Sequence, residues 1–288
     1  MKEIRIEGLR SLKDTGNIPI KPLTILLGEN SSGKSTFLRT FPLLRQSLET
    51  NTRGPILWYG PFVDFGRFED AQSKFSPDKK VSFSFTFDAG EISDSMPNNF
   101  LSLTGLSDGE LTVRLSLIND GRDKSTRIVS FEIDHNDNKI SVQLDKSDKI
   151  ERCVSNGIDL TDVFSDAIML SGSPRAPLIP SIKFKRTGAP YYLRFEDLDN
   201  EKLEKKIIDK LSPLLHSRTN RTDFVQKVKR VLLVKKSELL STLKPLSKTS
   251  TWGKKLQQIS PESELIASLH AYILAAKLPI LLHFINGT

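Results

Sequence analysis

Hydrophobic and polar positions near the start of the chain alternate in short runs and then change to a helical period. Ile4 and Ile6 alternate with polar residues, as do Ile18 and Ile20, while residues 23–27 (LTILL) form an unbroken apolar run. Alternation predicts half-covered strands, and the unbroken run predicts a strand buried on both faces. Apolar residues then recur at helical spacing at Phe37, Leu38, Phe41, Leu44 and Leu48. The order strand, glycine-containing loop and helix predicts an α/β fold.

From about residue 79 the hydrophobic period becomes two. Four segments show it: Val81 to Phe87, Leu111 to Leu117, Val129 to Ile133 and Ile140 to Leu144. Turn-forming residues separate the later segments, so we expect an antiparallel meander with one face buried.

Beyond a loop rich in Pro and Gly at 171–190, the pattern becomes helical. Helices are expected over 203–215, 224–240 and 262–278. The chain thus divides into a core that carries the glycine-containing loop, with an antiparallel β subdomain, residues 1–170, and a helical lobe, residues 171–288. The apolar stretch 265–285 contains Lys277 and Pro279, which favour a buried helix that breaks near Pro279 over a membrane span.

Composition and the first residues indicate the cellular compartment of the protein. The chain has 288 residues with one cysteine, Cys153, which excludes an internal disulfide framework and fits a reducing compartment. Its first residues, MKEIRIEG, carry charges where a secretory signal would be apolar. We therefore expect a cytoplasmic protein with no membrane partner.

The positive charge is concentrated in the helical lobe. The net charge is +7 overall, but residues 183–255 hold 19 Lys and Arg against 8 Asp and Glu, a net +11, which leaves −4 for the rest. Candidates for contacting a nucleic-acid backbone are Lys227, Lys229, Arg230, Lys235 and Lys236. A solvated helix face is the alternative interpretation of the same cluster.

The segment 28–35 (GENSSGKS) matches the phosphate-binding pattern G-x-x-x-x-G-K-[ST]. Gly28 and Gly33 allow the backbone to curl so that N–H groups point at phosphates, at the positive end of the following helix. Lys34 is expected to reach the β- and γ-phosphates, and the Ser35 hydroxyl to bind Mg²⁺. Thr36 is a candidate for the α-phosphate. The remaining loop residues, with weaker claims, are Glu29, Asn30, Ser31 and Ser32.

The segments IRIEGLRSLKD, ILLGENSSGKSTFLR and GPFVDFGRFEDA, followed by the meander, resemble the N-terminal half of ABC-type ATPases of the SMC/RecF/OLD group. They look most like OLD-like ATPases of bacterial anti-phage systems, including retron-associated effectors. The resemblance implies ATP and Mg²⁺ as cofactors. It places Arg10 and Ser11 near the nucleotide and makes Gln72 a possible Q-loop ligand of the metal; a surface glutamine is the alternative for Gln72.

The chain departs from that group in its second half. It contains no apolar strand that ends in Asp-Glu, as a Walker B strand would. Residues 106–110 (LSDGE) imitate a signature loop, but they precede a strand rather than a helix, so we interpret them as unrelated. His270 and His283 are interpreted as packed helix residues rather than a switch histidine. We expect the signature, the Walker B strand and a possible Toprim nuclease domain to lie beyond residue 288.

The leading hypothesis is an ATP-binding and ATP-hydrolysing subunit of an OLD-like ATPase-nuclease that acts on nucleic acid in anti-phage defence. Its partners would be a second ATPase head in a homo-oligomer, a nucleic acid, and a defence protein such as a reverse transcriptase or nuclease. The alternative is a nucleotide-gated scaffold that binds ATP and partner proteins without appreciable turnover. A small-molecule P-loop kinase fits the meander and the basic lobe poorly.

Overall fold

The structure is a computed structural model of the chain. It describes residues 1–50, 54–94, 109–119, 121, 126–136, 138–165, 167–170, 180–184, 201–215, 220, 224, 254, 255, 258 and 263–285.

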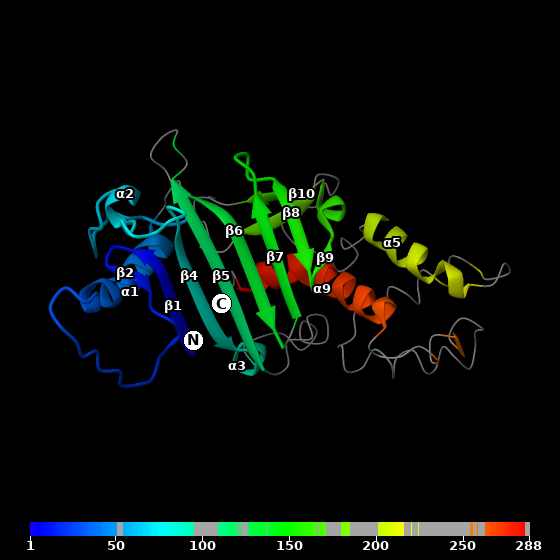
Figure 1. Ribbon diagram of the computed structural model, residues 1–288, viewed down its shortest axis with the longest axis horizontal. Coiled ribbons are helices and arrows are strands. Elements are labelled where there is room, and N and C mark those ends of the chain that lie inside the picture. Colours follow the sequence, from blue (N-terminus) through cyan, green and yellow to red (C-terminus); the bar gives the residue numbers. More distant parts are fainter. Residues whose placement is uncertain are drawn as a thin grey trace.

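One large antiparallel sheet dominates the described fold (Figure 1). Its strands are β1 (Glu3–Leu9), β2 (Leu12–Asp14), β3 (Ile18–Pro19), β4 (Val81–Asp88), β5 (Glu110–Asn119), β6 (Thr126–His135), β7 (Asn138–Leu144), β8 (Ile150–Ser155) and β9 (Ile158–Asp159). Their spatial order is β2-β1-β4-β5-β6-β7-β8-β9, and β3 also pairs with β1. A separate pair is formed by β10 (Ala167–Leu170) and β11 (Ser181–Phe184).

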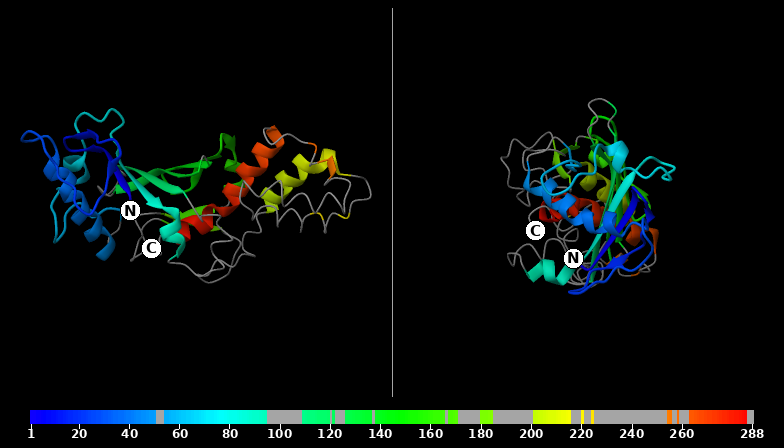
Figure 2. Two further views of the ribbon diagram at one scale, coloured as in Figure 1. Left: turned by 90° about the horizontal axis from the view of Figure 1, so that it is seen from below. Right: turned by 90° about the vertical axis from the view of Figure 1, so that its left-hand side faces the viewer.

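The helices lie at the ends and on one side of this sheet (Figures 1 and 2). They are α1 (Lys34–Glu49), α2 (Phe68–Ala71), α3 (Ala89–Asp94), α5 (Glu201–Leu211) and α9 (Glu264–Ile285), with 3₁₀ turns η1 (Thr161–Phe164) and η3 (Ser212–Leu214). The mixed α/β class expected from the sequence is confirmed.

The core follows from the period-two pattern of the strands. One row of facing residues crosses six strands in register, and all of its side chains are buried: Ile6, Phe83, Leu115, Phe131, Val142 and Cys153. Because successive side chains of a strand point to opposite faces, this register places the apolar set of every strand on one face. The predicted meander is confirmed, and the sheet extends it by β1 on one side and by β8 and β9 on the other.

Helix α9 covers part of the apolar face. It packs against β7, β8 and β11, and the Ser155 hydroxyl donates a hydrogen bond of 2.9 Å to the carbonyl of Ala271. The helix continues through Pro279 to Ile285, so the predicted break near Pro279 is wrong. Proline removes one backbone hydrogen bond, but Leu278 and Leu282 are fully buried on the two sides of that position and hold the helix in place.

Helices α1 and α5 agree with the expected positions, whereas residues 225–240 of the second predicted helix lie outside the described residues. Among the described helices none combines the length and the apolar character that crossing a membrane requires.

Candidate nucleotide-binding site

The backbone of residues 28–33 curls through conformations that side chains rarely adopt. Gly28, Ser31 and Gly33 have φ values of 151°, 64° and 101°. A Cβ atom on Gly33 would lie 2.4 Å from Cδ2 of Leu12, the first residue of β2. Both the positive φ and the close approach therefore require glycine at position 33.

Lys34 is the first residue of α1 and folds back over the loop. Its Nζ donates hydrogen bonds to the carbonyls of Gly28 at 2.7 Å and Glu29 at 2.6 Å. No side chain caps the helix at Gly33, so the first amides of α1, from Lys34 to Thr36, are available to an anion. The ammonium group, the free amides and the helix dipole converge on one exposed surface, which is the arrangement a phosphate chain requires.

The other predicted loop residues lie around this surface. Glu29, Asn30, Ser31, Ser32 and Ser35 are exposed, and Thr36 is partly buried. A hydroxyl oxygen is a ligand type that Mg²⁺ accepts, so Ser35 fits the metal-binding role that its position in the motif implies.

The structure brings Arg10, Ser11 and Gln72 to the same end of β1. Gln72 forms an isolated antiparallel bridge with Leu9, and the N–H of Arg10 donates to the carbonyl of Ala71 at 2.7 Å. Ser11 reaches the phosphate loop itself, because its Oγ would lie 3.2 Å from a Cβ on Gly33. Three residues that the sequence resemblance singled out are thus neighbours of the loop or of one another.

Residues 54–67 pack along α1, and a buried glutamine holds them there. Gln46 donates to the carbonyls of Leu57 at 2.5 Å and Val63 at 3.1 Å, and its Oε1 accepts from the N–H groups of Phe62 and Val63. The Gln46 side chain is fully buried. The sequence interpretation missed this residue, although a glutamine on the apolar face of a helix is the signal that marks such a position.

The segment before the loop differs from its prediction. Residues 23–27 form no strand, and Leu23, Ile25 and Leu27 are 78%, 69% and 89% exposed. A strand needs a neighbour for its backbone hydrogen bonds. Both edges of β1 are already occupied by β4 on one side and by β2 and β3 on the other. The prediction of a strand buried on both faces is therefore wrong for the described structure, while the following helix is confirmed.

The remaining predicted residues lie elsewhere. The basic candidates Lys227, Lys229, Arg230, Lys235 and Lys236 are outside the described residues, as are residues 106–108 of the signature-like segment. Position 110, the last of that segment, begins β5. His270 and His283 both belong to α9.

Burial raises the pKa of Cys153 to about 12, with a smaller contribution from the charge of Asp159, so its thiol is unsuited to nucleophilic chemistry.

Comparison with known proteins identifies the domain. The family model described as an AAA ATPase domain matches residues 1–271, which is nearly the whole chain. This range includes the phosphate loop, the complete sheet and the beginning of α9, up to residue 271. The match supports ATP binding and hydrolysis as the general activity. No curated protein matches the chain at a significant level.

Proposed function

The chain belongs to the AAA ATPase domain family, and we propose that it binds ATP with Mg²⁺ at residues 28–36. The observation that carries the proposal is the loop in which Gly33 is required by space and by φ, while the ammonium of Lys34 lies over the loop backbone. Lys34 and the first amides of α1 bind the phosphates, and Ser35 is a ligand of Mg²⁺. Bound Mg²⁺ neutralises charge on the phosphate oxygens.

ATP turnover is the second part of the proposal. Arg10, which precedes Ser11 at the end of β1, is a candidate for supplying a positive charge to the site, and Gln72 is a candidate for orienting water or the metal. ATPases with a Walker B strand use a carboxylate to polarise the attacking water. Arg10 and Gln72 cannot supply that carboxylate. We propose that the heads act in pairs, so that a second copy of the chain completes the nucleotide site, with ATP binding favouring engagement and hydrolysis favouring release.

A lysine pair tests nucleotide binding directly. Lys34→Ala should abolish binding of MgATP measured by calorimetry on the full chain, because it removes the ammonium that meets the phosphates. Lys146→Ala removes the same charge from an exposed turn after β7 and should leave binding unchanged. Equal affinities for the wild type and the Lys34→Ala variant would refute the proposal.

The proposed biological role is that of an OLD-like ATPase-nuclease component in anti-phage defence that acts on nucleic acid. Its support is the sequence resemblance around the phosphate loop and the net +11 of residues 183–255. Reversing the charge of Lys227, Lys229 and Arg230 should weaken binding of labelled DNA or RNA, and binding of the wild type should fall steeply with salt. Reversal of Lys139, Lys146 and Lys149, on the sheet and its turn, is the matched control. Binding that is insensitive to salt, or lost equally in the control, would contradict this role.

A nucleotide-gated scaffold is the second candidate, and the absence of an apolar strand ending in Asp-Glu from the sequence favours it. Such a protein would bind MgATP with little release of phosphate. Phosphate release by the purified chain that disappears in Lys34→Ala would exclude the scaffold, whereas binding without release would support it.

A further inference from the structure

Two arginines, Arg10 directly after β1 and Arg39 on α1, share one aromatic ring. The guanidinium carbon of Arg10 lies 4.6 Å from the centroid of Phe65, and that of Arg39 lies 5.1 Å from the same centroid. Phe65 is fully buried. The negative face of an aromatic ring attracts a guanidinium, and here one ring serves two of them.

Arg39 also forms a hydrogen bond with the backbone next to the ring. Its Nη2 donates a hydrogen bond of 2.5 Å to the carbonyl of Asp64. Phe65 is held from the other side, because its N–H donates to the carbonyl of Trp58 at 2.8 Å and the two rings meet edge to face. The position of Phe65 is therefore determined by the core and by α1 together.

These contacts form a closed circuit around the phosphate loop. Helix α1 begins at Lys34 and carries Arg39 little more than one turn further on. Arg39 holds Phe65, and Phe65 holds Arg10. Arg10 is followed by Ser11, whose Oγ would lie 3.2 Å from a Cβ on Gly33. The circuit thus returns to Gly33, the last residue before α1.

The two arginines keep their charge available. Within the described part of the chain, neither Arg10 nor Arg39 forms an ion pair with a carboxylate, whereas Arg5 and Arg114 on the sheet both do. Arg10 has a left-handed backbone, φ 48°, which costs free energy for a residue with a side chain. The contact between the Arg10 guanidinium and the Phe65 ring offsets part of that cost.

We propose that Arg39 and Phe65 are positioning residues that hold the Arg10 guanidinium against the phosphate loop, so that the site prefers a nucleoside triphosphate to a diphosphate. The inference rests on the proposed ATP site and assigns its preference to residues outside the motif. A fixed cation interacts more strongly with the more highly charged nucleotide, and it does so best when its position is preorganised.

The test is the ratio of the affinities for MgATP and MgADP, measured by calorimetry on the full chain. Arg39→Met removes the charge and the hydrogen bond but keeps the length of the side chain. We expect the ATP-to-ADP preference to fall by about tenfold, the effect of one charge-assisted contact. Phe65→Leu should lower the ratio in the same direction. Arg39→Lys, which keeps a charge and a donor for the carbonyl of Asp64, should restore part of it.

The control is an arginine on the same helix with the same kind of contact. Arg45 lies 5.0 Å from the centroid of Phe62 and pairs with Glu49, away from the circuit. Arg45→Met should leave the ratio unchanged.

The outcomes separate this inference from the proposed function. If Lys34→Ala abolishes binding but Arg39→Met behaves like Arg45→Met, the inference is wrong and the ATP site stands. A loss of ATP and ADP affinity by the same factor in Arg39→Met would show a merely structural role and would also overturn it. If the Lys34→Ala variant binds MgATP normally, the proposed ATP site and the inference that rests on it are both wrong.

Discussion

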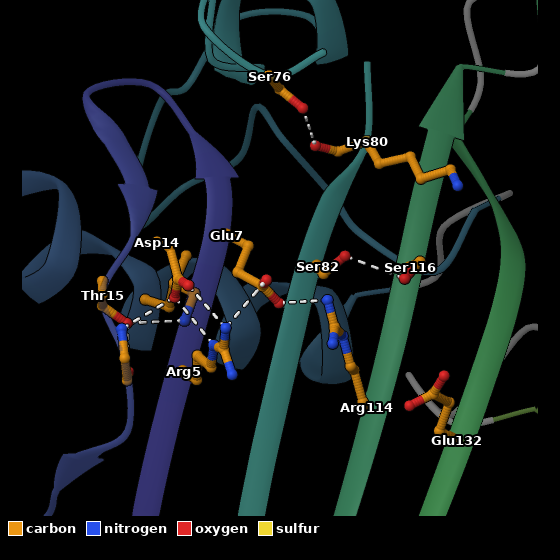
Figure 3. A network of polar contacts seen from close by, with 12 residues as sticks. Arg5, Glu7, Asp14, Thr15, Ser76, Lys80, Ser82, Arg114, Ser116 and Glu132 are labelled. Carbon is orange, nitrogen blue, oxygen red and sulfur yellow. Dashed lines mark hydrogen bonds and ion pairs between the residues drawn. The ribbon is translucent and has the colours of Figure 1, made fainter. Parts of the chain in front are cut away.

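Arginines on the polar face of the sheet and arginines beside the phosphate loop are held by different chemistry. On the sheet, Arg5 donates to both carboxylate oxygens of Asp14 at 2.9 and 2.6 Å. Glu7 accepts a hydrogen bond from Arg5 at 3.4 Å and forms an ion pair with Arg114 at 2.6 Å (Figure 3). These side chains join β1, β2 and β5 across one face. Their charges are neutralised within the protein, so their role is in the stability of the sheet.

Beside the phosphate loop, a ring and a carbonyl take the place of the carboxylates. Arg10 and Arg39 contact Phe65 and the carbonyl of Asp64, which hold a guanidinium in position without neutralising its charge. The contrast teaches that the charge of an arginine is neutralised where carboxylates surround it and is kept where a ring and a carbonyl hold it.

The largest effect is expected at Gly33. Gly33→Ala places a methyl group 2.4 Å from Leu12 at a φ of 101°, so the loop must move. We expect MgATP affinity to fall by about a hundredfold or more, measured by calorimetry, because the loop amides no longer converge.

Gly157→Ala is its control. Gly157 has a φ of 80° but open space around it, in the turn between β8 and β9. This variant should cost about 1 kcal/mol of stability and leave ATP binding intact. Normal ATP binding by Gly33→Ala would show that the loop does not bind phosphates in this conformation.

Gln46→Leu tests how firmly residues 54–67 are attached to α1. The substitution removes the partner of the buried N–H of Val63 and of the partly buried N–H of Phe62 and carbonyl of Leu57. We expect the free energy of unfolding in urea to fall by about 3 kcal/mol or more. Gln143→Leu, at an exposed position of β7, should have little effect. Similar stabilities for the two variants would contradict the importance of this attachment.

Glu7→Gln disturbs the sheet arginines and not those of the loop. It removes the charge that Arg5 and Arg114 share, so unfolding in urea should require about 1–2 kcal/mol less. The ATP-to-ADP preference should not change, in contrast with the effect expected for Arg39→Met. A change in nucleotide preference without a change in stability would break the distinction between the two groups of arginines.

The smallest effect is a dependence of stability on pH. The Arg5 guanidinium holds the pKa of Asp14 below its ordinary value, and the N–H of Gly16 contributes in the same direction. Because the native pKa is lowered, the stabilisation is fully present above the unfolded pKa and is lost as the pH falls through the native pKa. Unfolding free energies should therefore decline below about pH 5, and less steeply in Asp14→Asn. Arg5→Met should flatten the same region; an unchanged slope in both variants would show that this pair is not responsible.

The strands and the long helices of this chain could be predicted because each depends on a local period. The alternation from Val81 to Phe87 predicted β4, and the spacing after Lys34 predicted α1. Residues 23–27 show the limit of such patterns, since five apolar residues favour a buried strand only if another strand is beside them. Pro279 shows a second limit, because packing on both sides of the proline keeps α9 continuous.

The motif at 28–36 and its chemistry were contained in the order of the residues, because a phosphate loop needs glycines, a lysine and a hydroxyl at fixed separations. The family match agrees with that reading. The environment of the loop depended on contacts between distant segments. Leu12 requires glycine at position 33, Gln46 holds residues 57–63, and Phe65 brings Arg10 and Arg39 together. No local period encodes these contacts, because they arise only when the end of β1, helix α1 and residues 54–67 pack against one another.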